Sequence, residues 1–450
     1  MLNLPEFEVL LKEQNEHFYR FTVERIEPPF ICTNCGEIKS EYTNPDAEFK
    51  RHQVKERTVS DISMHGKAVR IVIRHRRWKC PFCDGTFYEL LDSVDRNDKV
   101  TKRLKEHMKK LALKKPFTNI ADEYGISHTS VRRYFEQYVE DMERDRYLVA
   151  PKVLGIDEAH LNKTMRGVFT DTENFKLLEI TKDNTKRTVK ETIQRMEGYK
   201  NIEVATIDMY SGYKYAIQEL IPNCFIVTDK FHVVQYAIRA LDAIRIQVKK
   251  SLPKKDQRLL TYDRWVLLKN KEDLEFKEIL KRNEWFEQFP QLKTAYWLKE
   301  GIRDIYRESK DKQEALERFD KWEKDIPTDM KEFKEIRKTF NNNKTEIFNY
   351  FDKPFTNAYT ESVNNIIKAV EKEGKGYSFD VLRAKVLYGT EATIKKPKYT
   401  EDMQFKKFDK LWGGRFNTIQ PITIQTDEPT ILNCGVDLTT LSKILEEGRF

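Results

Sequence analysis

The spacing of apolar and polar residues changes character along the first third of the chain. Residues 69–75 (VRIVIRH) alternate apolar and basic side chains, which predicts a strand with one buried face, and residues 65–67 before them predict a turn. Apolar residues at helical spacing predict helices over residues 95–147. Residues 1–30 are interpreted as a short helix and an extended arm that ends in two prolines.

After residue 152 the pattern is that of an α/β protein. The runs VLGID (153–157) and VATID (204–208) are expected to be buried strands that end in acids, and residues 168–183 are expected to form a two-stranded hairpin. Amphipathic helices are predicted between these strands, so the order is strand, hairpin, helix, strand, helix, strand. Residues 250–345 lose the strand pattern and are interpreted as all-helical, and residues 360–373 are predicted to be a further helix.

Composition adds a charge pattern to these elements. Hydrophobic residues make up 39% of the 450-residue chain and charged residues 34%, with a formal net charge of +8. Basic residues gather at 74–79, 102–110 and 131–135, which suits a polyanion such as DNA, although such runs also occur on solubilising surfaces. The chain has no apolar stretch of the ~18 residues that a membrane span needs, and its first residues lack the basic start of a signal peptide. A cytoplasmic protein without a membrane partner is therefore expected.

Two Cys-x-x-Cys pairs suggest a metal site. Four of the six cysteines form these pairs, Cys32 with Cys35 and Cys80 with Cys83. Four thiolates are the ligand set of a closed, structural Zn²⁺ site, so one Zn²⁺ ion is expected. Chance spacing of reduced cysteines is the alternative, whereas a redox Cys-x-x-Cys motif needs no second pair. Cys224 and Cys434 are expected to be incidental thiols.

Residues 117–139 have the pattern of a helix-turn-helix. Thr118 is expected to cap the first helix, Gly125 to supply the turn and Ser127 to cap the second helix. Near its start the second helix would present a DNA-facing set to a major groove: His128, Thr129, Ser130, Arg132 and Arg133. The basic hairpin would add contacts through Arg74, Arg76 and Arg77. A helical hairpin inside a core that touches no DNA is the alternative.

Three carboxylates are candidates for metal-dependent phosphoryl chemistry. Asp157 and Asp208 each follow a predicted buried strand, and the ends of adjacent strands meet at one edge of an α/β sheet. Two carboxylates there repel unless a divalent cation lies between them, and Mg²⁺ prefers oxygen ligands. Glu361, at the start of a predicted helix, would complete a two-metal site. Each acid alone is more often a helix cap or an ion-pair partner.

Four blocks of sequence resemble the conserved blocks of insertion-sequence DDE transposases, and most closely those of the ISL-three family. They are GIDEAH (155–160), TIDMYSGY (206–213), DKFHVVQ (229–235) and NAYTESVNNIIKAV (357–370). The resemblance implies a zinc-binding domain and a helix-turn-helix before an RNase H-like core. A helical insertion would separate the second Asp from the Glu. The resemblance reaches to about residue 390.

By position, the resemblance implies that Asp157, Asp208 and Glu361 are the catalytic triad, which would bind two Mg²⁺ or Mn²⁺ ions. Asp229 and His232 match a D-x-x-H element near the active site, where His232 would orient the scissile phosphate or a carboxylate, or serve as a structural histidine.

Further residues in or near these blocks receive weaker assignments from the resemblance. Asn364 and Asn365 are interpreted as DNA contacts or caps. A structural role is favoured for His160 and a core role for Trp265.

The expected fold class is therefore multidomain α+β. The expected segments are an N-terminal arm (1–30), a zinc-binding domain (31–92), a helix-turn-helix domain (95–147), a first part of the catalytic core (152–249), a helical insertion (250–345), a final part of the core (346–390) and a tail of unassigned role (391–450).

The expected function is transposition. The partners would be double-stranded DNA, as terminal inverted repeats and as target, and a second copy of the chain or a larger homo-oligomer. The protein would act in the bacterial cytoplasm on the nucleoid. Two alternatives remain open: a domesticated, sequence-specific DNA-binding regulator, and an RNase H-like nuclease that does not transpose.

Overall fold

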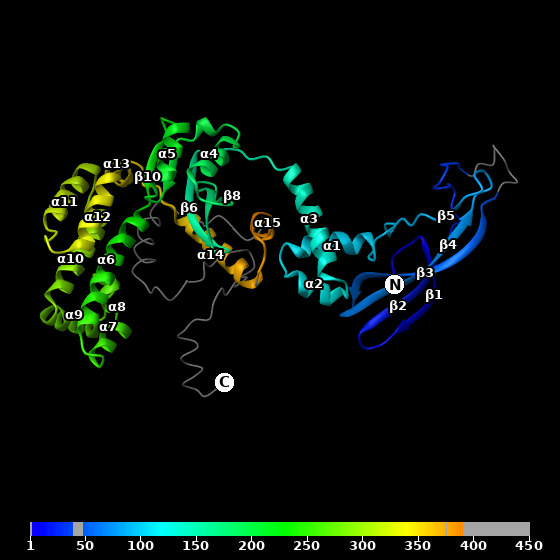
Figure 1. Ribbon diagram of the computed structural model, residues 1–450, viewed down its shortest axis with the longest axis horizontal. Coiled ribbons are helices and arrows are strands. Elements are labelled where there is room, and N and C mark those ends of the chain that lie inside the picture. Colours follow the sequence, from blue (N-terminus) through cyan, green and yellow to red (C-terminus); the bar gives the residue numbers. More distant parts are fainter. Residues whose placement is uncertain (1, 39–47, 375, 390–450) are drawn as a thin grey trace. The chain divides into compact units, whose positions relative to one another are not determined.

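The computed structural model describes residues 2–38, 48–374 and 376–389 (Figure 1). These residues divide into two compact units. The first unit comprises Met1–Tyr147 and Ala369–Thr390, and the described part of the second is Leu148–Lys368. No helix of the described residues is both long enough and apolar enough to cross a membrane. The tail at 391–450, for which the sequence suggested no role, lies outside the described residues.

The first unit begins with a sheet of five strands in the order β1-β2-β4-β3, with β5 on β4. Their bounds are β1 (Phe7–Gln14), β2 (Phe18–Arg25), β3 (Lys50–Met64), β4 (Lys67–Lys79) and β5 (Thr86–Tyr88). The predicted strand at 69–75 and the turn before it are confirmed, because β3 and β4 form an antiparallel hairpin across that turn. The two ends of this hairpin carry the chain from one cysteine pair to the other.

The helix and extended arm expected over residues 1–30 are wrong. Those residues form β1 and β2, and β2 pairs in parallel with β4. Phe21 and Val23, two positions apart on β2, are buried in the core of this sheet. Pairing with a strand about 50 residues away in the chain therefore decides the conformation, and a local pattern does not report such pairing.

Four helices complete the first unit: α1 (Lys102–Ala112), α2 (Phe117–Tyr124), α3 (His128–Arg144) and α15 (Phe379–Gly389). The predicted helix-turn-helix elements are confirmed as α2 and α3. Gly125 has the left-handed φ of +57° that the turn between them requires. Ser127 caps α3, since its hydroxyl accepts a hydrogen bond from the Ser130 amide at 3.2 Å.

Thr118 does not cap α2, contrary to expectation. It lies inside the helix, whose N-cap position is occupied by Pro116 without a side-chain hydrogen bond. Pro116 has the fixed φ of proline and an extended ψ of 143°, and no side chain at this position accepts a hydrogen bond from the amides of the first turn.

The second unit contains a five-stranded mixed sheet in the order β10-β9-β6-β7-β8. Strands β6, β9 and β10 are parallel, whereas β6, β7 and β8 form an antiparallel meander. The bounds are β6 (Val153–Leu161), β7 (Thr164–Asp171), β8 (Lys176–Ile180), β9 (Val204–Ile207) and β10 (Phe225–Thr228). The predicted order of strands and helices in this region is confirmed.

Helices cover both faces of this sheet (Figure 1). On one face α4 (Lys186–Gln194) and α5 (Ser211–Leu220) pack on Leu154, Ala205 and Ile226, while the 3₁₀ turn η1 (Tyr199–Asn201) leads into β9. On the other face α6 (Lys230–Ser251) packs on Val153, Val204 and Val227. Alternate residues of each strand therefore enter two different cores, as a sheet between two helical layers requires.

Every element from Lys230 to Phe351 is helical, as the hydrophobic pattern predicted for residues 250–345. After α6 these are α7 (Leu259–Tyr262), α8 (Trp265–Leu268), α9 (Phe276–Gln288), α10 (Pro290–Glu308), α11 (Lys312–Lys324), α12 (Lys331–Asn342) and α13 (Lys344–Phe348). Short 3₁₀ turns intervene: η2 (Asp256–Arg258), η3 (Lys271–Asp273) and η4 (Asn349–Phe351). The chain then enters α14 (Ala358–Gly374), which confirms the helix predicted at 360–373.

Candidate active site and metal centres

Asp157 lies on β6 and Asp208 directly after the adjacent strand β9, at one edge of the second sheet. The parallel pairing of β6 with β9 ends at Gly155 and Thr206, and each aspartate lies two residues beyond its paired residue. Asp208 directly follows β9, as predicted. Asp157 does not end its strand, because β6 continues to Leu161 through pairing with β7. The expected position at the sheet edge is therefore reached by a strand that extends past its shorter neighbour.

His232 and Glu361 bring two further elements to Asp157. His232 lies in the first turn of α6, directly after β10, and Glu361 lies in the first turn of α14. The Nε2 atom of His232 is 3.4 Å from Oδ1 of Asp157 and 3.9 Å from Oε1 of Glu361. Asp229, at the N-cap position of α6, completes the group, and ligand atoms of Asp229, His232 and Glu361 all lie within 4.8 Å of one another.

Burial and mutual repulsion raise the pKa values of the acids. Burial raises the pKa of Asp208 to about 6, and the negative charges of Glu158 and Asp157 act in the same direction. Burial raises the pKa of Glu361 to about 9, with Asp229 as the next cause. A nearby cation would therefore stabilise the charged form of these carboxylates.

His232 supplies positive charge beside these carboxylates. Burial alone would lower its pKa, but the close approach of Nε2 to Asp157 at 3.4 Å and the charges of Asp157 and Asp229 outweigh it and raise the pKa to about 9. The neighbouring acids therefore favour the charged, imidazolium form of His232.

The donor set fits hard divalent cations. Both carboxylate oxygens of Asp229 and Oε1 of Glu361 are buried and accept no hydrogen bond within the described part of the chain. Buried, unpaired carboxylate oxygens are costly, and coordination to an oxygen-preferring ion such as Mg²⁺ would satisfy them.

Asn364 holds Asp157 in place, a role that the sequence did not reveal. Its Nδ2 donates to Oδ2 of Asp157 at 2.8 Å and to the carbonyl of Glu158 at 3.3 Å. Asn364 was expected to be a DNA contact or a cap, together with Asn365, which is exposed. Asn364 is instead buried one helical turn after Glu361. Only its position on the same helix face as Glu361 hinted at this contact.

Asn357 fixes the start of the helix that carries Glu361. It is fully buried, and its Nδ2 donates to the carbonyl of Ile156 at 2.9 Å. Its Oδ1 accepts hydrogen bonds from Thr206 at 3.3 Å and from Thr360 at 2.5 Å. One asparagine thus connects β6, β9 and α14 directly beneath the acids.

The other predicted residues lie further from this group. His160 is exposed on the last part of β6. Trp265 is half-buried against the helical core, with the Arg264 guanidinium 5.0 Å from its ring, which agrees with the favoured core role. Cys224 is half-buried beside the core formed with α4 and α5, and Cys434 lies outside the described residues.

The four paired cysteines come together in the first unit. Their Sγ atoms all lie within 4.8 Å of one another, and two cross-pair distances, Cys32 to Cys83 and Cys35 to Cys80, are both 3.9 Å. Sulfurs around a tetrahedral Zn²⁺ ion with Zn–S bonds of ~2.3 Å are about 3.8 Å apart. Gly36 has the positive φ of 74° that the first turn needs. The geometry supports one structural Zn²⁺ ion.

The predicted DNA-facing residues differ in their exposure and in their ion pairs. On α3, His128, Thr129, Arg132 and Arg133 are exposed and Ser130 is half-buried, with Arg132 paired to Glu136 at 2.7 Å. On β4, Arg74 is partly exposed, whereas Arg76 is buried and pairs with Glu89 at 2.8 Å. Arg77 is half-buried, 5.8 Å from the ring of Tyr88. Arg76 therefore contributes to the core of the zinc-bearing sheet.

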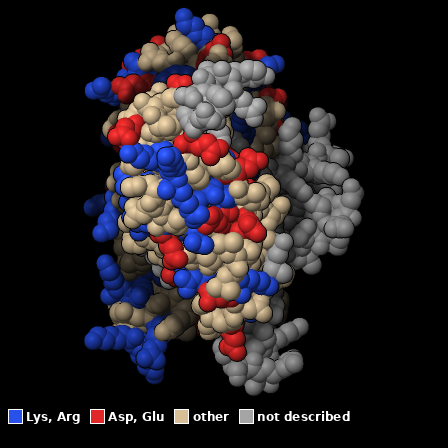
Figure 2. Space-filling model, turned by 90° about the vertical axis from the view of Figure 1, so that its right-hand side faces the viewer, with Lys and Arg blue, Asp and Glu red and all other residues tan. Residues whose placement is uncertain are grey.

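The face of the molecule drawn in Figure 2 carries Lys and Arg in several separate clusters, with Asp and Glu between them. This face therefore offers local basic patches and not one continuous basic surface.

Comparison with known proteins gives the class and then the family. A family model described as "Transposase" (DDE_Tnp_ISL3) matches residues 154–386, more than half of the chain. Two further models match residues 89–139, "Helix-turn-helix domain of transposase family ISL3", and residues 45–83, "zinc-finger of transposase IS204/IS1001/IS1096/IS1165". The class of protein is thus an insertion-sequence transposase. The chain belongs to the ISL3 (ISL-three) transposase family.

A named relative agrees with this family. The chain is 23% identical over 380 residues to the "Transposase for insertion sequence element IS1001" of Bordetella parapertussis. The match covers 79% of this chain and 92% of the relative. The zinc-finger match includes Cys80 and Cys83, while the first cysteine pair precedes it.

Proposed function

We propose that this transposase cleaves and joins DNA strands by a DDE mechanism, with Asp157, Asp208 and Glu361 as the metal-binding acids. The observation that carries the proposal is the gathering of acids from three distant stretches of chain with His232, whose Nε2 lies 3.4 Å from Asp157 and 3.9 Å from Glu361. Asp229 is buried in the same group. Such a group costs free energy unless cations neutralise it.

We further propose an RNase H-like fold for the catalytic core, interrupted by the helical segment at 250–345. The support is a mixed sheet with an antiparallel meander followed by parallel strands, and the uninterrupted run of helices from Lys230 to Phe351. In this arrangement Asp208 and Glu361 are far apart in sequence, but both belong to the second unit.

The residues divide the chemistry between them. Asp157, Asp208 and Glu361 would hold two Mg²⁺ or Mn²⁺ ions. Bound there, these ions supply Lewis-acid chemistry that activates a water or a DNA 3′-hydroxyl and stabilises the leaving oxygen. Asn364 orients the carboxylate of Asp157 through its 2.8 Å hydrogen bond. His232 holds a proton on Nε2 between Asp157 and Glu361, where it is also placed to contact a scissile phosphate.

DNA recognition is assigned to the first unit. Exposed residues at the start of α3 would read the terminal inverted repeats in the major groove, and Arg74 and Arg77 would contact phosphates. Two element ends must be paired before strand transfer, so a homodimer or larger assembly is proposed. Its DNA substrate would place the protein on the nucleoid.

The test is strand cleavage and joining on labelled duplexes taken from the DNA that flanks the gene. Wild-type protein with Mg²⁺ should cut and join them, whereas Asp157→Asn, Asp208→Asn and Glu361→Gln should each bind the duplex normally without cutting it. A wild-type protein that binds but never cuts would indicate a regulator, and cutting without joining would indicate a nuclease. A triad variant that cuts like wild type would remove that residue from the site.

A further inference from the structure

The last turn of α6 and the segment that follows it carry five cations and one acid. Residues 249–258 (KKSLPKKDQR) are here called the basic turn. It contains Lys249, Lys250, Lys254, Lys255 and Arg258, and its one acid is Asp256. Four of these cations are exposed and Lys249 is half-buried. Among the ion pairs of the described residues none involves any of the five.

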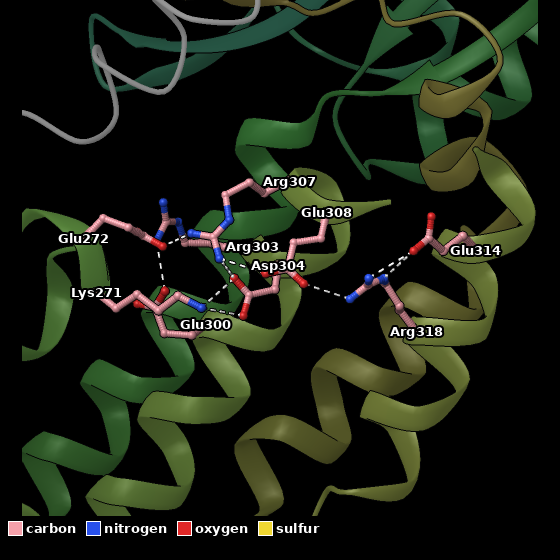
Figure 3. A network of polar contacts seen from close by, with 9 residues as sticks. All are labelled: Lys271, Glu272, Glu300, Arg303, Asp304, Arg307, Glu308, Glu314 and Arg318. Carbon is pink, nitrogen blue, oxygen red and sulfur yellow. Dashed lines mark hydrogen bonds and ion pairs between the residues drawn. The ribbon is translucent and has the colours of Figure 1, made fainter. Parts of the chain in front are cut away.

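Several cations elsewhere in the same helical region are paired with acids, whereas others such as Lys277, Lys293 and Lys334 are in no ion pair of the described residues. Figure 3 shows such a network between η3, α10 and α11, in which Lys271 pairs with Asp304 at 2.8 Å, Arg303 with Glu300 at 2.9 Å and Arg307 with Glu272. Arg318 pairs with Glu308 at 2.9 Å on the neighbouring helix. In that network the positive and negative side chains offset one another, so its cations are not available to an external anion. The basic turn lacks such partners, and its charge is therefore available to an anionic ligand.

The basic turn has a defined distance from the candidate active site. His232 and Lys250 lie on the same helix, α6, which runs from the sheet to the far end of the helical region in Figure 1. At ~1.5 Å per residue the helix rises about 27 Å between them. This corresponds to roughly 8 base pairs at ~3.4 Å each, so the turn begins slightly less than one turn of B-DNA away from His232.

Exposed apolar side chains border the same segment. Tyr262, at the end of α7, is 76% exposed, and Leu259 is 52% exposed. Aromatic rings interleaved with unpaired cations are typical of surfaces that track a nucleic-acid backbone. The combination of ring and charge favours a polynucleotide over a small anion.

We infer that the basic turn binds the phosphodiester backbone of the DNA duplex whose strand is cleaved in the active site. For a duplex that runs along α6, contact begins about 8–10 base pairs from the scissile phosphate. The inference rests on the proposed function, because it takes the duplex in the active site as given. It assigns a DNA contact to the catalytic unit itself, independent of the helix-turn-helix and the zinc-bearing sheet.

The experiment measures the salt dependence of DNA binding by the full-length protein. A 40-base-pair duplex of arbitrary sequence is titrated between low and moderate salt with wild type and with Lys254→Ala/Lys255→Ala. Each phosphate contact adds about −0.9 to the slope of log K against log salt, so losing two contacts should make that slope less negative by about 2. Hydroxyl-radical footprints on the flanking-DNA duplex should also lose protection 8–10 base pairs from the cut.

A matched control removes two cations that already have acidic partners. Lys312 pairs with Asp352 at 2.6 Å and Lys344 with Asp320 at 2.8 Å, so Lys312→Ala/Lys344→Ala should keep the wild-type slope. A second pair, Lys250→Ala/Arg258→Ala, guards against a local folding defect in the first.

Three outcomes decide the inference. A change of slope in both basic-turn variants but not in the control supports it. An unchanged slope in both basic-turn variants overturns it, and so does an equal change in the control. Wild-type cleavage of the flanking duplex is measured separately, so the proposed function can stand when this inference fails.

Discussion

At the scale of single residues, Asp157 is held from both sides. Asn364 donates to one carboxylate oxygen at 2.8 Å, and His232 lies 3.4 Å from the other. A carboxylate fixed in this way presents its remaining lone pairs in one orientation, which lowers the entropy lost when a cation binds. The local geometry is therefore that of a prepared metal ligand.

The change Asn364→Ala tests this orientation. Residues that orient metal ligands typically contribute 10–100-fold to metal affinity or activity, so cleavage should fall by about that factor and should need more Mg²⁺ for half-maximal rate. DNA binding and the thermal midpoint should change little. The control is Asn365→Ala on the exposed side of the same helix. Identical Mg²⁺ titrations for Asn364→Ala and wild type would refute the role.

Gly155 tests how tightly the site is packed beneath the acids. A Cβ atom at this position would meet Oγ1 of Thr170 at 2.5 Å and Oδ1 of Asn357 at 2.7 Å, both in buried, hydrogen-bonded positions. Gly155→Ala should therefore lower the free energy of unfolding by about 1–3 kcal/mol, as overpacking of a core does. Because Asn357 fixes the start of α14, cleavage should fall as well.

The measurements for Gly155→Ala are urea unfolding and the rate of strand cleavage at a temperature where the variant remains folded. Gly66→Ala provides a contrast, because a Cβ there has open space and only the positive φ of 74° opposes it. It should lose stability in the first unit without losing catalytic rate in a bound complex. Wild-type stability and cleavage rate in Gly155→Ala would mean that Thr170 and Asn357 can move aside at little cost, which would contradict tight packing at this position.

At the scale of elements, α15 is held against the helix-turn-helix by buried or half-buried polar groups. Nζ of Lys385 donates to the carbonyl of Lys115 at 2.9 Å, and Arg383 pairs with Glu143 of α3 at 2.6 Å. Tyr388 also contacts Glu143. Burial alone would raise the pKa of Glu143, but these hydrogen bonds outweigh it and lower the pKa.

The lowered pKa of Glu143 predicts a pH dependence with a definite sign. An acid with a depressed folded pKa stabilises the protein above its unfolded pKa of about 4.3, and this contribution is lost as the pH falls below that value. Glu143→Gln should cost about 1 kcal/mol at pH 7, since the pair is partly exposed and screened, and almost nothing near pH 3. Urea unfolding at both values checks this. The exposed neighbour Glu140 serves as control, and an equal effect of Glu140→Gln would contradict the ion-pair explanation.

At the scale of the whole molecule, local patterns predicted most elements and tertiary pairing decided the rest. The hairpin, the helix-turn-helix and the order of strands and helices each depend on residues close in sequence, so periodicity and turn residues report them. Seven of the eight residues of β1 are exposed, so its pattern carries no periodic signal, and its partner β2 is fixed by β4. The hydrogen bond from Asn364 to Asp157 joins residues 207 positions apart, and no sequence spacing encodes it.

The division into two compact units leads to the last prediction, which concerns zinc. All four clustered cysteines lie in the first unit, so Cys80→Ser should lower only the thermal transition of that unit and should reduce the zinc content from one equivalent. Cys224→Ala, at a half-buried position beside a core of the second unit, should affect only the other transition. Calorimetry together with metal analysis separates these effects. A full equivalent of zinc in Cys80→Ser would contradict the ligand assignment, and one shared transition that both variants lower equally would contradict independent unfolding. Because the acids lie in the second unit and the zinc ligands in the first, zinc loss should weaken binding to element ends before it affects the geometry around Asp157.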